Sequence, residues 1–548
     1  MWKEERSVMR TYRLARVRPR RWHAIAATSA ALPLLAALPS GSAAASASAS
    51  AGSGGPGWIS HVQWTTQQVA PGVTVRASVL SDPSARPYWT VTIDATTTSS
   101  ITGQPADAEL GTASWATATA AALRADGYSP DVTAVQWPDY SDSPHGLEGY
   151  LVRTGDFATQ AAAQALADTL DDLGFTSASV EWTGYDADQA PDAEQTHEAI
   201  IDPSLTRIEV THHGILAQNQ TTSSVAAALG ALVATNGGFF ITSDADGFEG
   251  APAGLAVYDG QLESINTGPR AALIIDNGRP EIADVEATVT VHAGNASYPI
   301  NGINRIPGIS DQCGRPGDEP TSQPRQDIVC TVGSELVLFT GDLGAPAPAG
   351  TGTQAVLSPD GTVLSVGTQT GGDVPAGGSI IQGIGAAGAW LARHAAAGQR
   401  LAVSEQLATT SGQPIPLNPG LSIASAAPIL VKNGETAIDA VSEGNIDPAD
   451  LSFNYSWAED RQPRTIAGIT SDGDLILVTV DGRQPGVSEG ATLSEEAALM
   501  ESLGAVDAMN LDGGGSTAIA VDGQLVNVPS AGERADGDFV VVLPETGR

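Results

Sequence analysis

A short glycine-rich run near the C-terminus has residue types that can hold an anion and orient water. It reads Met509-Asn510-Leu511-Asp512-Gly513-Gly514-Gly515-Ser516-Thr517, and the apolar residues before Asp512 predict a strand over 506–511. Consecutive glycines can aim successive main-chain N–H groups at one anion, without a positive side chain. A triple glycine alone is more often a plain turn, so the run indicates a phosphate site only together with other signals.

Three arginines in the C-terminal half could bind the same anion. Arg464 precedes a strand predicted over 475–480, Arg483 follows that strand in Asp481-Gly482-Arg483, and Arg534 follows Glu533. A guanidinium group binds phosphate oxygens through two parallel hydrogen bonds, which favours arginine for this task. Each of these residues by itself is more often part of a surface ion pair.

A second glycine-rich segment, Asn236-Gly237-Gly238-Phe239-Phe240, follows the apolar residues 231–234. Adjacent glycines between a buried strand and two aromatic residues predict that a main chain or a ligand approaches closely there. A tight bend above buried phenylalanines explains the same pattern equally well.

The order of these segments carries more information than any one of them. Along the chain they run as 236–240, 427–435, 464–483, a helix, 509–517 and 526–534. In this order they resemble the phosphodiester glycosidase family, from near residue 223 to residue 543. The resemblance implies hydrolysis of a sugar-1-phosphodiester, such as a GlcNAc-1-phosphodiester, at the glycosidic bond. The products would be the free sugar and a phosphomonoester.

Matching positions to the family implies a set of cleft residues. The substrate-binding candidates are Asn236, Gly237, Arg464, Arg483, Asn510, Gly513, Gly514, Gly515, Ser516 and Arg534. The catalytic candidates are Asp512, Asp481 and, in reserve, Glu533. Because the leaving group is already a phosphate, positioning and charge stabilisation matter more than acid assistance. We therefore expect the arginines and the glycine run to hold the phosphate, while the two aspartates orient water or support positive charge on the sugar.

Metal chemistry has little support in the sequence. There is no HExxH motif, and Asp244-Ala245-Asp246-Gly247 lacks the remaining ligands of an EF-hand loop. We expect no cofactor, although these patterns do not exclude a divalent metal. Thr517 and Ala518 stand where family members commonly have Ser-Thr, a difference that leaves the substrate open.

The two cysteines, Cys313 and Cys330, are an even pair in a chain with an export signal. The simplest prediction is one disulfide, and the alternative is two free thiols.

Short strands must position most of the candidate residues. From residue 200 onward, apolar runs are separated by Asn-Gly or Asp-Gly pairs, which favour type I′ hairpins. These pairs begin at residues 259, 277, 360, 433, 472, 481 and 522. Two helices are predicted, over 223–233 and over 494–503, the second beginning at Ser494 with two glutamates in its first turn. We expect a long, antiparallel, β-rich domain over 200–548.

A different pattern precedes this domain. Strand-like residues 88–93 and 150–154 each come before a helix, and each helix ends at a glycine and is followed by another strand. The order β-α-β-β-α-β predicts a split βαβ, ferredoxin-like fold over 58–185, including preceding strands. The run from Gly149 to Phe175 resembles a SPOR module, a family that implies peptidoglycan binding; a spacer or a packed subdomain is the alternative. Residues 186–199 are acidic and predict a linker.

The N-terminus has the layout of an export signal. Eight basic residues lie within 3–21, an apolar stretch covers 24–38, and small residues follow. We predict a signal peptide over 1–44, a flexible linker over 45–57, and no stable membrane insertion after cleavage, so the mature protein would be secreted or held in the cell envelope.

Charge and pattern together define the predicted fold class and function. The chain has 548 residues and a net charge of −36, from 26 basic and 62 acidic groups, which argues against nucleic-acid binding. The fold class is α+β, with a β-rich phosphodiester glycosidase domain after a split βαβ module. The predicted function is an exported glycosidase acting on a glycan or sugar phosphate. A non-catalytic protein that binds cell-wall glycans on the same scaffold is the alternative.

Overall fold

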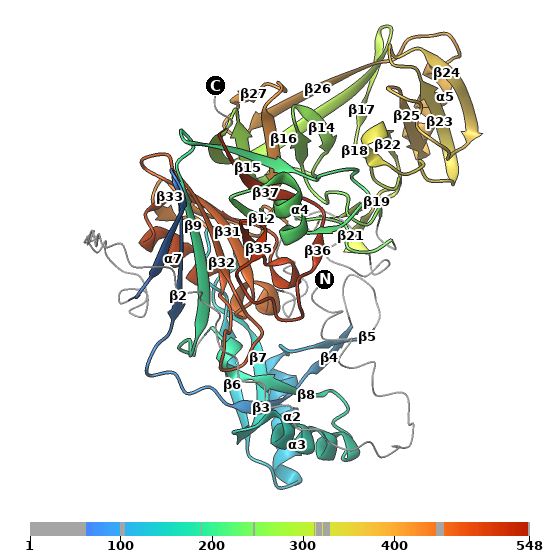
Figure 1. Cartoon of the computed structure of the whole chain (residues 1–548). Helices are drawn as coiled ribbons and strands as arrows, with labels where there is room; N and C mark the ends of the chain where they lie inside the picture. Colours follow the sequence, from blue (N-terminus) through green and yellow to red (C-terminus); the bar gives the residue numbers. More distant parts are fainter. Residues whose placement is uncertain are drawn as a thin grey trace, which may run out of the picture. The chain divides into compact units, whose positions relative to one another are not determined.

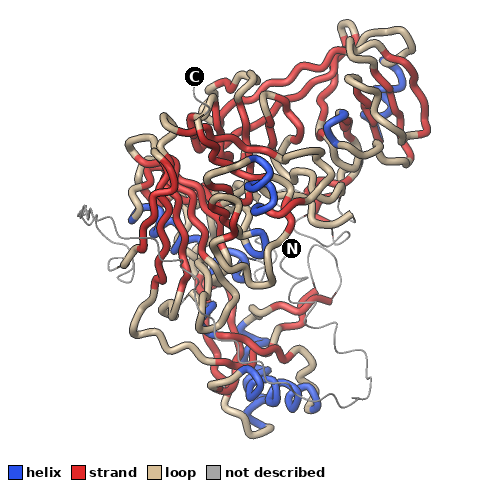
Figure 2. The backbone as a smooth tube through the Cα atoms, in the orientation of Figure 1, coloured by secondary structure: helices blue, strands red, loops and turns tan. Residues whose placement is uncertain are grey.

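The computed structural model describes residues 62–98, 105–187, 189–244, 247–311, 313, 320–321, 329–444 and 454–545. The predicted signal peptide over 1–44 and the linker over 45–57 lie outside these residues. Strands dominate the described part of the chain and helices are few, as Figure 2 shows. The prediction of a β-rich protein is confirmed.

An α/β module, defined here as residues 89–182, contains a four-stranded antiparallel sheet in the order β6-β7-β3-β8. Its strands are β3 (Trp89–Ile93), β6 (Pro130–Gln136), β7 (Leu147–Phe157) and β8 (Ala178–Trp182). Helix α2 (Ala113–Ala125) follows β3, and α3 (Gln160–Asp172) follows β7. The chain order is therefore β-α-β-β-α-β, which confirms the predicted split βαβ topology.

Both helices of the module pack on one face of its sheet. Leu123 from α2, Leu170 from α3 and Val152 from β7 belong to a single buried cluster. The glycines that were expected to end the helices do so in the left-handed conformation, with φ of 91° at Gly127 and 103° at Gly174. A small hairpin of β4 (Ala95–Thr98) and β5 (Pro105–Ala108) is inserted between β3 and α2.

The sheet whose end carries most of the candidate site residues has eight strands, in the order β1-β2-β9-β32-β31-β33-β29-β30. The bounds are β1 (Thr65–Ala70), β2 (Val73–Leu80), β9 (Glu194–Ile201), β29 (Ile429–Lys432), β30 (Glu435–Thr436), β31 (Arg464–Thr470), β32 (Leu475–Val480) and β33 (Ala505–Asn510). In Figure 1 the neighbouring β9, β32 and β31 lie side by side, although β9 is far from the other two in sequence.

This sheet corrects two predicted boundaries. The linker predicted over 186–199 contains most of β9, a strand that pairs with β2 on one side and β32 on the other. The strands before the α/β module, β1 and β2, belong to the same sheet and not to the module. Residues 194–201 are buried or partly buried, and both edges of β9 are paired. The polar composition of this stretch hid the strand from the sequence pattern.

The remaining strands form several smaller sheets and one further sheet of eight. A five-stranded sheet contains β10 (Thr206–Thr211), β37 (Phe539–Pro544), β12 (Val233–Asn236), β34 (Ile519–Val521) and β35 (Gln524–Leu525). A short ladder joins β11 (Gln220–Thr221) to β36 (Ala535–Asp536). The second eight-stranded sheet contains β13 (Ala256–Tyr258), β14 (Gln261–Ser264), β15 (Arg270–Asp276), β16 (Arg279–Ala293), β17 (Ala296–Ile300), β26 (Ala402–Thr409), β27 (Pro414–Ile415) and β28 (Leu421–Ser425). Another sheet contains β18 (Gly302–Ile303), β22 (Glu335–Phe339), β23 (Thr351–Leu357), β24 (Val363–Gln369) and β25 (Ser379–Ile384), and the last contains β19 (Ile309–Asp311), β20 (Pro320–Thr321) and β21 (Val329–Thr331).

The helices of the C-terminal part partly match their predictions. They are α4 (Thr222–Leu229), α5 (Gly385–His394) and α7 (Leu493–Ser502), with short 3-10 or π turns η3 (Thr183–Tyr185), η4 (Gly341–Leu343), η5 (Tyr455–Glu459) and η6 (Gly514–Ser516). Helix α4 ends earlier than predicted because Gly230 turns left-handed. Helix α7 begins one residue earlier than predicted, at Leu493, since Thr492 and Glu495 form a capping box. Helix α5 was not predicted.

Most Asn-Gly and Asp-Gly pairs adopt the expected turn. Both residues have positive φ at the pairs beginning with Asp259, Asn277, Asn433 and Asp522, as a type I′ hairpin requires. The pair beginning with Asp481 does not, because the left-handed residue there is Arg483, with φ of 58°. The chain therefore leaves β32 in a bend that carries Arg483.

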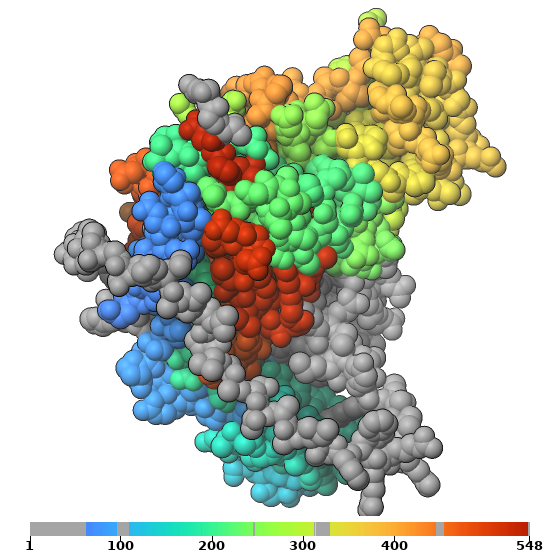
Figure 3. Space-filling view, in the orientation of Figure 1, coloured from blue at the N-terminus to red at the C-terminus, as the bar shows by residue number. Residues whose placement is uncertain are grey.

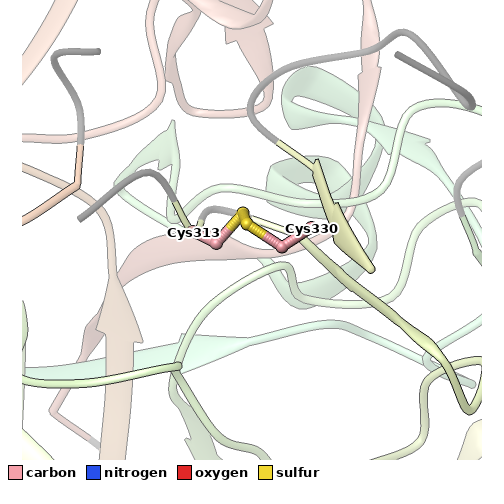
Figure 4. The surroundings of a disulfide bond; sticks show 2 residues. All are labelled: Cys313 and Cys330. Atoms are coloured by element: carbon pink, nitrogen blue, oxygen red, sulfur yellow. A yellow bond between two sulfur atoms is a disulfide. The ribbon is translucent and has the colours of Figure 1, made fainter. Parts of the chain in front are cut away.

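The predicted disulfide is present between Cys313 and Cys330, both of which are buried (Figure 4). Among the described residues, none of the helices is long and apolar enough to cross a membrane. The last segments of the chain, coloured red, reach the surface on the face shown in Figure 3.

Candidate active site

Three strand ends meet at one end of the first eight-stranded sheet. Strand β31 pairs antiparallel with both β32 and β33, so β31 begins where its two neighbours end. Arg464 opens β31, Asp481 directly follows β32, and Asp512 comes just after β33. These residues, which lie far apart in sequence, therefore share one end of the sheet.

Most of the glycine run uses its amides within the protein. The amides of Gly514, Ser516 and Thr517 donate to the carbonyls of Pro463, Gly513 and Gly514, at 2.8, 3.2 and 3.3 Å. The expected row of open N–H groups does not hold for these three amides, because η6 closes the turn on itself and on the start of β31. These three amides are therefore not available to an anion, which favours a contribution from side-chain donors.

Two guanidinium groups lie against the glycine run. A side chain added at Gly515 would place its Cβ 2.5 Å from Nη2 of Arg534, and one added at Gly514 would stand 3.4 Å from Nη2 of Arg483. Gly515 therefore allows Arg534 to approach the main chain closely, whereas a side chain at Gly514 would only reach ordinary contact distance from Arg483. Glycine is favoured at position 514 by its positive φ of 61°. Gln462 orients Arg483 by accepting a hydrogen bond from its Nε at 2.9 Å.

The two arginines affect each other electrostatically. Burial, followed by the positive charge of Arg534, lowers the pKa of Arg483 to about 9. Two like charges held together in a half-buried place are stabilised by an anion that bonds to both. The pair places two cations at this end of the sheet, on a chain whose net charge is −36.

Asn236 holds the main chain of Asp512 in place. Its Nδ2 donates to the carbonyl of Asp512 at 2.6 Å, and its Oδ1 accepts from Thr465 Oγ1 at 2.8 Å and from the Ala518 amide at 3.2 Å. The residue is buried and its amide group is committed to these bonds. The structure thus gives Asn236, expected to bind substrate, a positioning contact.

Three further candidates surround Asp512. The carbonyl of Gly237 accepts a hydrogen bond from the Asp512 amide at 3.0 Å, and a side chain at Gly237 would collide with Asp538. Asn510 donates from Nδ2 to the carbonyl of Ala427 at 2.7 Å. Ser516 is buried beside the glycine run.

Asp481 supports the loop that carries Arg534. Its Oδ1 accepts from Asn527 Nδ2 at 2.7 Å, and its Oδ2 accepts from the Val528 amide at 2.8 Å. Burial raises the pKa of Asp481, and these two hydrogen bonds act in the opposite direction. Asn527 also donates to the carbonyl of Thr517 at 3.0 Å, so it joins this loop to the glycine run. Both Asp481 oxygens are occupied, which favours a positioning role over the predicted catalytic one.

Arg464 is not at the surface of the site. It is buried, and it donates from Nε to the carbonyl of Ala491 at 2.9 Å and from Nη2 to that of Trp457 at 2.7 Å. Its Nε also lies 3.0 Å from Oε1 of Glu496, a buried glutamate on α7. The expectation that Arg464 clamps phosphate is corrected, because its side chain forms a buried ion pair with Glu496. The sequence did not indicate this pair, since Glu496 reaches Arg464 only through the packing of α7.

Glu533 is also placed differently from its prediction. Its Oε1 accepts from the amide of Ser223 at 2.7 Å, and its Oε2 accepts from the hydroxyl of the same residue at 2.6 Å. Ser223 lies in the first turn of α4, where a negative charge faces the positive end of the helix dipole. The contact explains Glu533 as a helix-capping residue.

Replacing Glu533 with Gln should therefore lower stability and leave the chemistry intact. We expect a loss of about 1–2 kcal/mol, the range for a helix cap or a charged hydrogen bond, and a rate of product release within about threefold of wild type. Urea unfolding and a turnover assay measure the two effects, with Glu209→Gln as the surface control. A hundredfold rate loss at unchanged stability would restore the catalytic role.

The segment that follows the α/β module helps to place Arg483. Arg461 is buried and donates from Nη1 to the carbonyl of Gly184 at 2.9 Å and from Nη2 to that of Gln189 at 2.7 Å, both in this segment. The next residue, Gln462, is the one that orients Arg483. The segment after the module is thus connected to the arginine pair through two consecutive residues.

Four contributing residues were not predicted from the sequence. They are Gln462, Asn527, Asp536 and Asp538. Asp538 accepts from the Gly238 amide at 2.7 Å and from the hydroxyl of Tyr258 at 2.8 Å, and burial raises its pKa to about 6. Alternation of polar residues through Arg534, Asp536 and Asp538, just before an apolar strand, is the signal that could have pointed to this segment.

A cluster of three carboxylates lies outside this site, within the residues that the structure describes. Asp284, Asp439 and Glu443 come close enough for their oxygens to share an ion. Both oxygens of Glu443 accept main-chain amides, from Ala271 at 2.7 Å and from Ile429 at 2.8 Å. These bonds give Glu443 a structural role, and we assign no metal to the cluster.

Comparison with protein families agrees with the predicted resemblance. Residues 351–543 match the family model described as phosphodiester glycosidase. This match confirms the resemblance for the part of the chain that carries Asp481, Arg483, Asp512 and Arg534. The glycine pair after Asn236 lies before the matched residues.

Curated relatives match over short stretches. The mouse N-acetylglucosamine-1-phosphodiester alpha-N-acetylglucosaminidase is 31% identical over 116 residues, which is 21% of this chain and 22% of the mouse protein. The SPbeta prophage-derived uncharacterized protein YomE of Bacillus subtilis is 41% identical over 90 residues, which is 16% of this chain and 14% of YomE. The chain thus spans about a fifth or less of the length of these relatives.

A solved structure matches nearly the whole chain. The crystal structure of a protein from Burkholderia pseudomallei, described as exported, superimposes with a TM-score of 0.75 and 29% identity. It covers 89% of this chain and 98% of its own. The arrangement of sheets therefore occurs in a second protein. None of these comparisons confirms the SPOR likeness of the α/β module.

Proposed function

We propose that this protein is a glycosidase that hydrolyses the glycosidic bond of a sugar-1-phosphodiester. The observation that carries the proposal is the pair of guanidinium groups, Arg483 and Arg534, lying on Gly514 and Gly515 beside Asp512. All five residues belong to the segment that matches the phosphodiester glycosidase family. The GlcNAc-1-phosphodiester named by the mouse relative is the first substrate to test.

The site suits departure of a phosphate from the anomeric carbon. As the C1–O bond breaks, its electron pair stays on the phosphate oxygen, and charge grows next to Arg483 and Arg534. Preorganised cations at the place where charge develops lower the barrier. Asp512 then orients the attacking water and accepts its proton, so the products are a free sugar and a phosphomonoester.

The identity of the bond that breaks can be measured directly. The purified protein is incubated with a synthetic GlcNAc-1-phosphodiester, and free GlcNAc, the alcohol and the phosphomonoester are quantified. Free sugar together with the phosphomonoester supports the proposal. Release of the alcohol with GlcNAc-1-phosphate would indicate cleavage of a P–O bond, and binding without turnover would favour the glycan-binding alternative.

The arginine pair predicts a loss of anion affinity in Arg483→Gln. A charge-assisted hydrogen bond is worth about 1.5–3 kcal/mol, so inhibition by inorganic phosphate should weaken by about 10- to 150-fold. The half-exposed Arg207, whose side chain is 57% exposed, supplies the control variant Arg207→Gln. Equal inhibition of the Arg483→Gln variant and wild type would remove the arginine pair from the site.

We propose that the protein acts outside the cytoplasm. The signal-like N-terminus, the buried disulfide and the exported structural neighbour support this location. Detection of the protein in the culture medium or envelope fraction, with loss of residues near 44, is the corresponding test.

A further inference from the structure

The segment after Glu533 places a third carboxyl group against the site. Residues 535–536 form β36, which is extended and pairs with β11, so alternate side chains point the same way. Arg534 lies on Gly515, and Asp538 accepts a hydrogen bond from the amide of Gly238. Asp536 lies between these two contacts in sequence.

That position brings Asp536 to the residues around Asp512. Gly515 is in the glycine run that follows Asp512, and the neighbour of Gly238, Gly237, accepts the Asp512 amide at 3.0 Å. The carboxyl group of Asp536 is accordingly close enough to interact with the charge of Asp512 and with the hydroxyl of Ser516. Asp536 opposes the uncharged Gln220 on β11, so β11 brings no compensating charge through that pair.

The carboxyl group of Asp536 makes no well-formed hydrogen bond. The residue is 2% exposed, and within the described part of the chain neither of its oxygens meets full hydrogen-bond geometry, although the Ser516 hydroxyl lies near enough to act on it as a side-chain donor. The Ser516 hydroxyl, 1% exposed, has no well-formed hydrogen bond among those residues either. Asp538, two residues along, has both oxygens bonded. A buried carboxyl without bonds is costly when ionised, so its neutral form is favoured.

On balance, the surroundings of Asp536 raise the pKa of its carboxyl group. Burial first, and the charge of Asp512 second, raise the pKa of Asp536 well above its usual range, and Glu533 adds a smaller effect. Ser516 and Arg534 oppose the rise without reversing it. Two carboxyl groups that share a dry site do not both ionise at neutral pH.

We infer that Asp536 is a positioning residue that holds a proton beside Asp512, so that the site presents one negative charge to the phosphodiester instead of two. The inference rests on the proposed function. A second carboxylate would offset the positive charge of Arg483 and Arg534 and repel the phosphate. Ionisation of Asp536 at alkaline pH therefore weakens phosphate binding, and an asparagine at this position imitates the protonated acid.

The first test compares pH profiles of kcat/KM for wild type and Asp536→Asn, with the exposed Asp472→Asn as control. At about pH 5 the Asp536→Asn variant should keep activity within about threefold of wild type. Its alkaline limb should move up by about one pH unit or more, or disappear. Profiles of the same shape would overturn the inference, whether or not the variant is slower throughout.

A second test does not depend on activity. A carboxyl whose pKa is raised on folding binds more protons in the folded state, so wild type loses stability as the pH rises from the unfolded pKa toward the folded one. The Asp536→Asn variant lacks this loss. Its melting temperature should exceed that of wild type by a margin that grows from about pH 4 to about pH 8. A margin independent of pH would overturn the inference.

Binding of inorganic phosphate separates this inference from the proposed function. If no sugar phosphodiester is cleaved, the proposed function fails, yet phosphate affinity can still be titrated against pH by calorimetry. We expect the affinity of wild type to fall at alkaline pH more steeply than that of Asp536→Asn. Parallel decline in both proteins would overturn the role of Asp536 alone.

Discussion

Replacing Asp512 with Asn should lower kcat for release of free sugar by about 100- to 10,000-fold, the range expected when a general base is removed. The side chain changes only from carboxylate to amide, so the water that attacks the sugar loses its proton acceptor. The fold should survive, because the Asp512 main chain keeps its hydrogen bonds with Gly237 and Asn236. Sugar release and urea unfolding, measured on the same preparation, check both parts.

The matched control for this variant is Asp507→Asn on β33, the strand that precedes Asp512. Asp507 accepts the amide of Asn433 at 3.1 Å and lies five residues before Asp512, away from the arginine pair. Its replacement should leave kcat within about threefold. A fully active Asp512→Asn variant would show that another group accepts the proton.

The second large effect concerns stability. Arg464→Met should lower the free energy of unfolding by about 3–5 kcal/mol, because it leaves Glu496 buried without its partner. The pair is held at 3.0 Å, and burial raises the pKa of Glu496 to about 8 even with the arginine present. An unpartnered Glu496 would bind a proton more tightly in the folded than in the unfolded state. The loss should therefore be larger at about pH 8 than at about pH 5.

A double replacement separates the ion pair from packing. Arg464→Met combined with Glu496→Met removes both buried charges, and it should recover most of the lost stability, since apolar replacement of a whole buried pair is often neutral. Urea unfolding of the single and double variants is the measurement. If Arg464→Met unfolded at the wild-type urea concentration but no longer bound inorganic phosphate, the earlier clamp role of Arg464 would be correct.

Local patterns determined much of the architecture. The periodicity of apolar residues and the turn-forming residue pairs predicted the split βαβ order, the strand over 475–480, the glycine ends of α2 and α3, and four type I′ turns. The cysteine pair predicted the disulfide. These features depend on residues close in sequence, or on a pair with no competitor, so composition and spacing suffice.

The roles of charged residues were decided by tertiary contacts. Arg464, Asp481 and Glu533 look like site residues in sequence, yet α7, the loop at 527–528 and the start of α4 bind their side chains. The acidic stretch ending at Ile201 looked like a linker and is β9, because β2 and β32 flank it.

What the sequence determined by itself is the kind of elements and the family resemblance of its C-terminal part. Only the tertiary structure decided which charges face the site and which are neutralised inside the protein. The physical reason is that an arginine or an aspartate is the same residue in the sequence whether it faces the site or is buried. The effect of its charge depends on partners that are distant in the chain. Asp536 shows this most clearly, since its burial, its pairing with Gln220 and its closeness to Asp512 follow from the fold and not from any local motif.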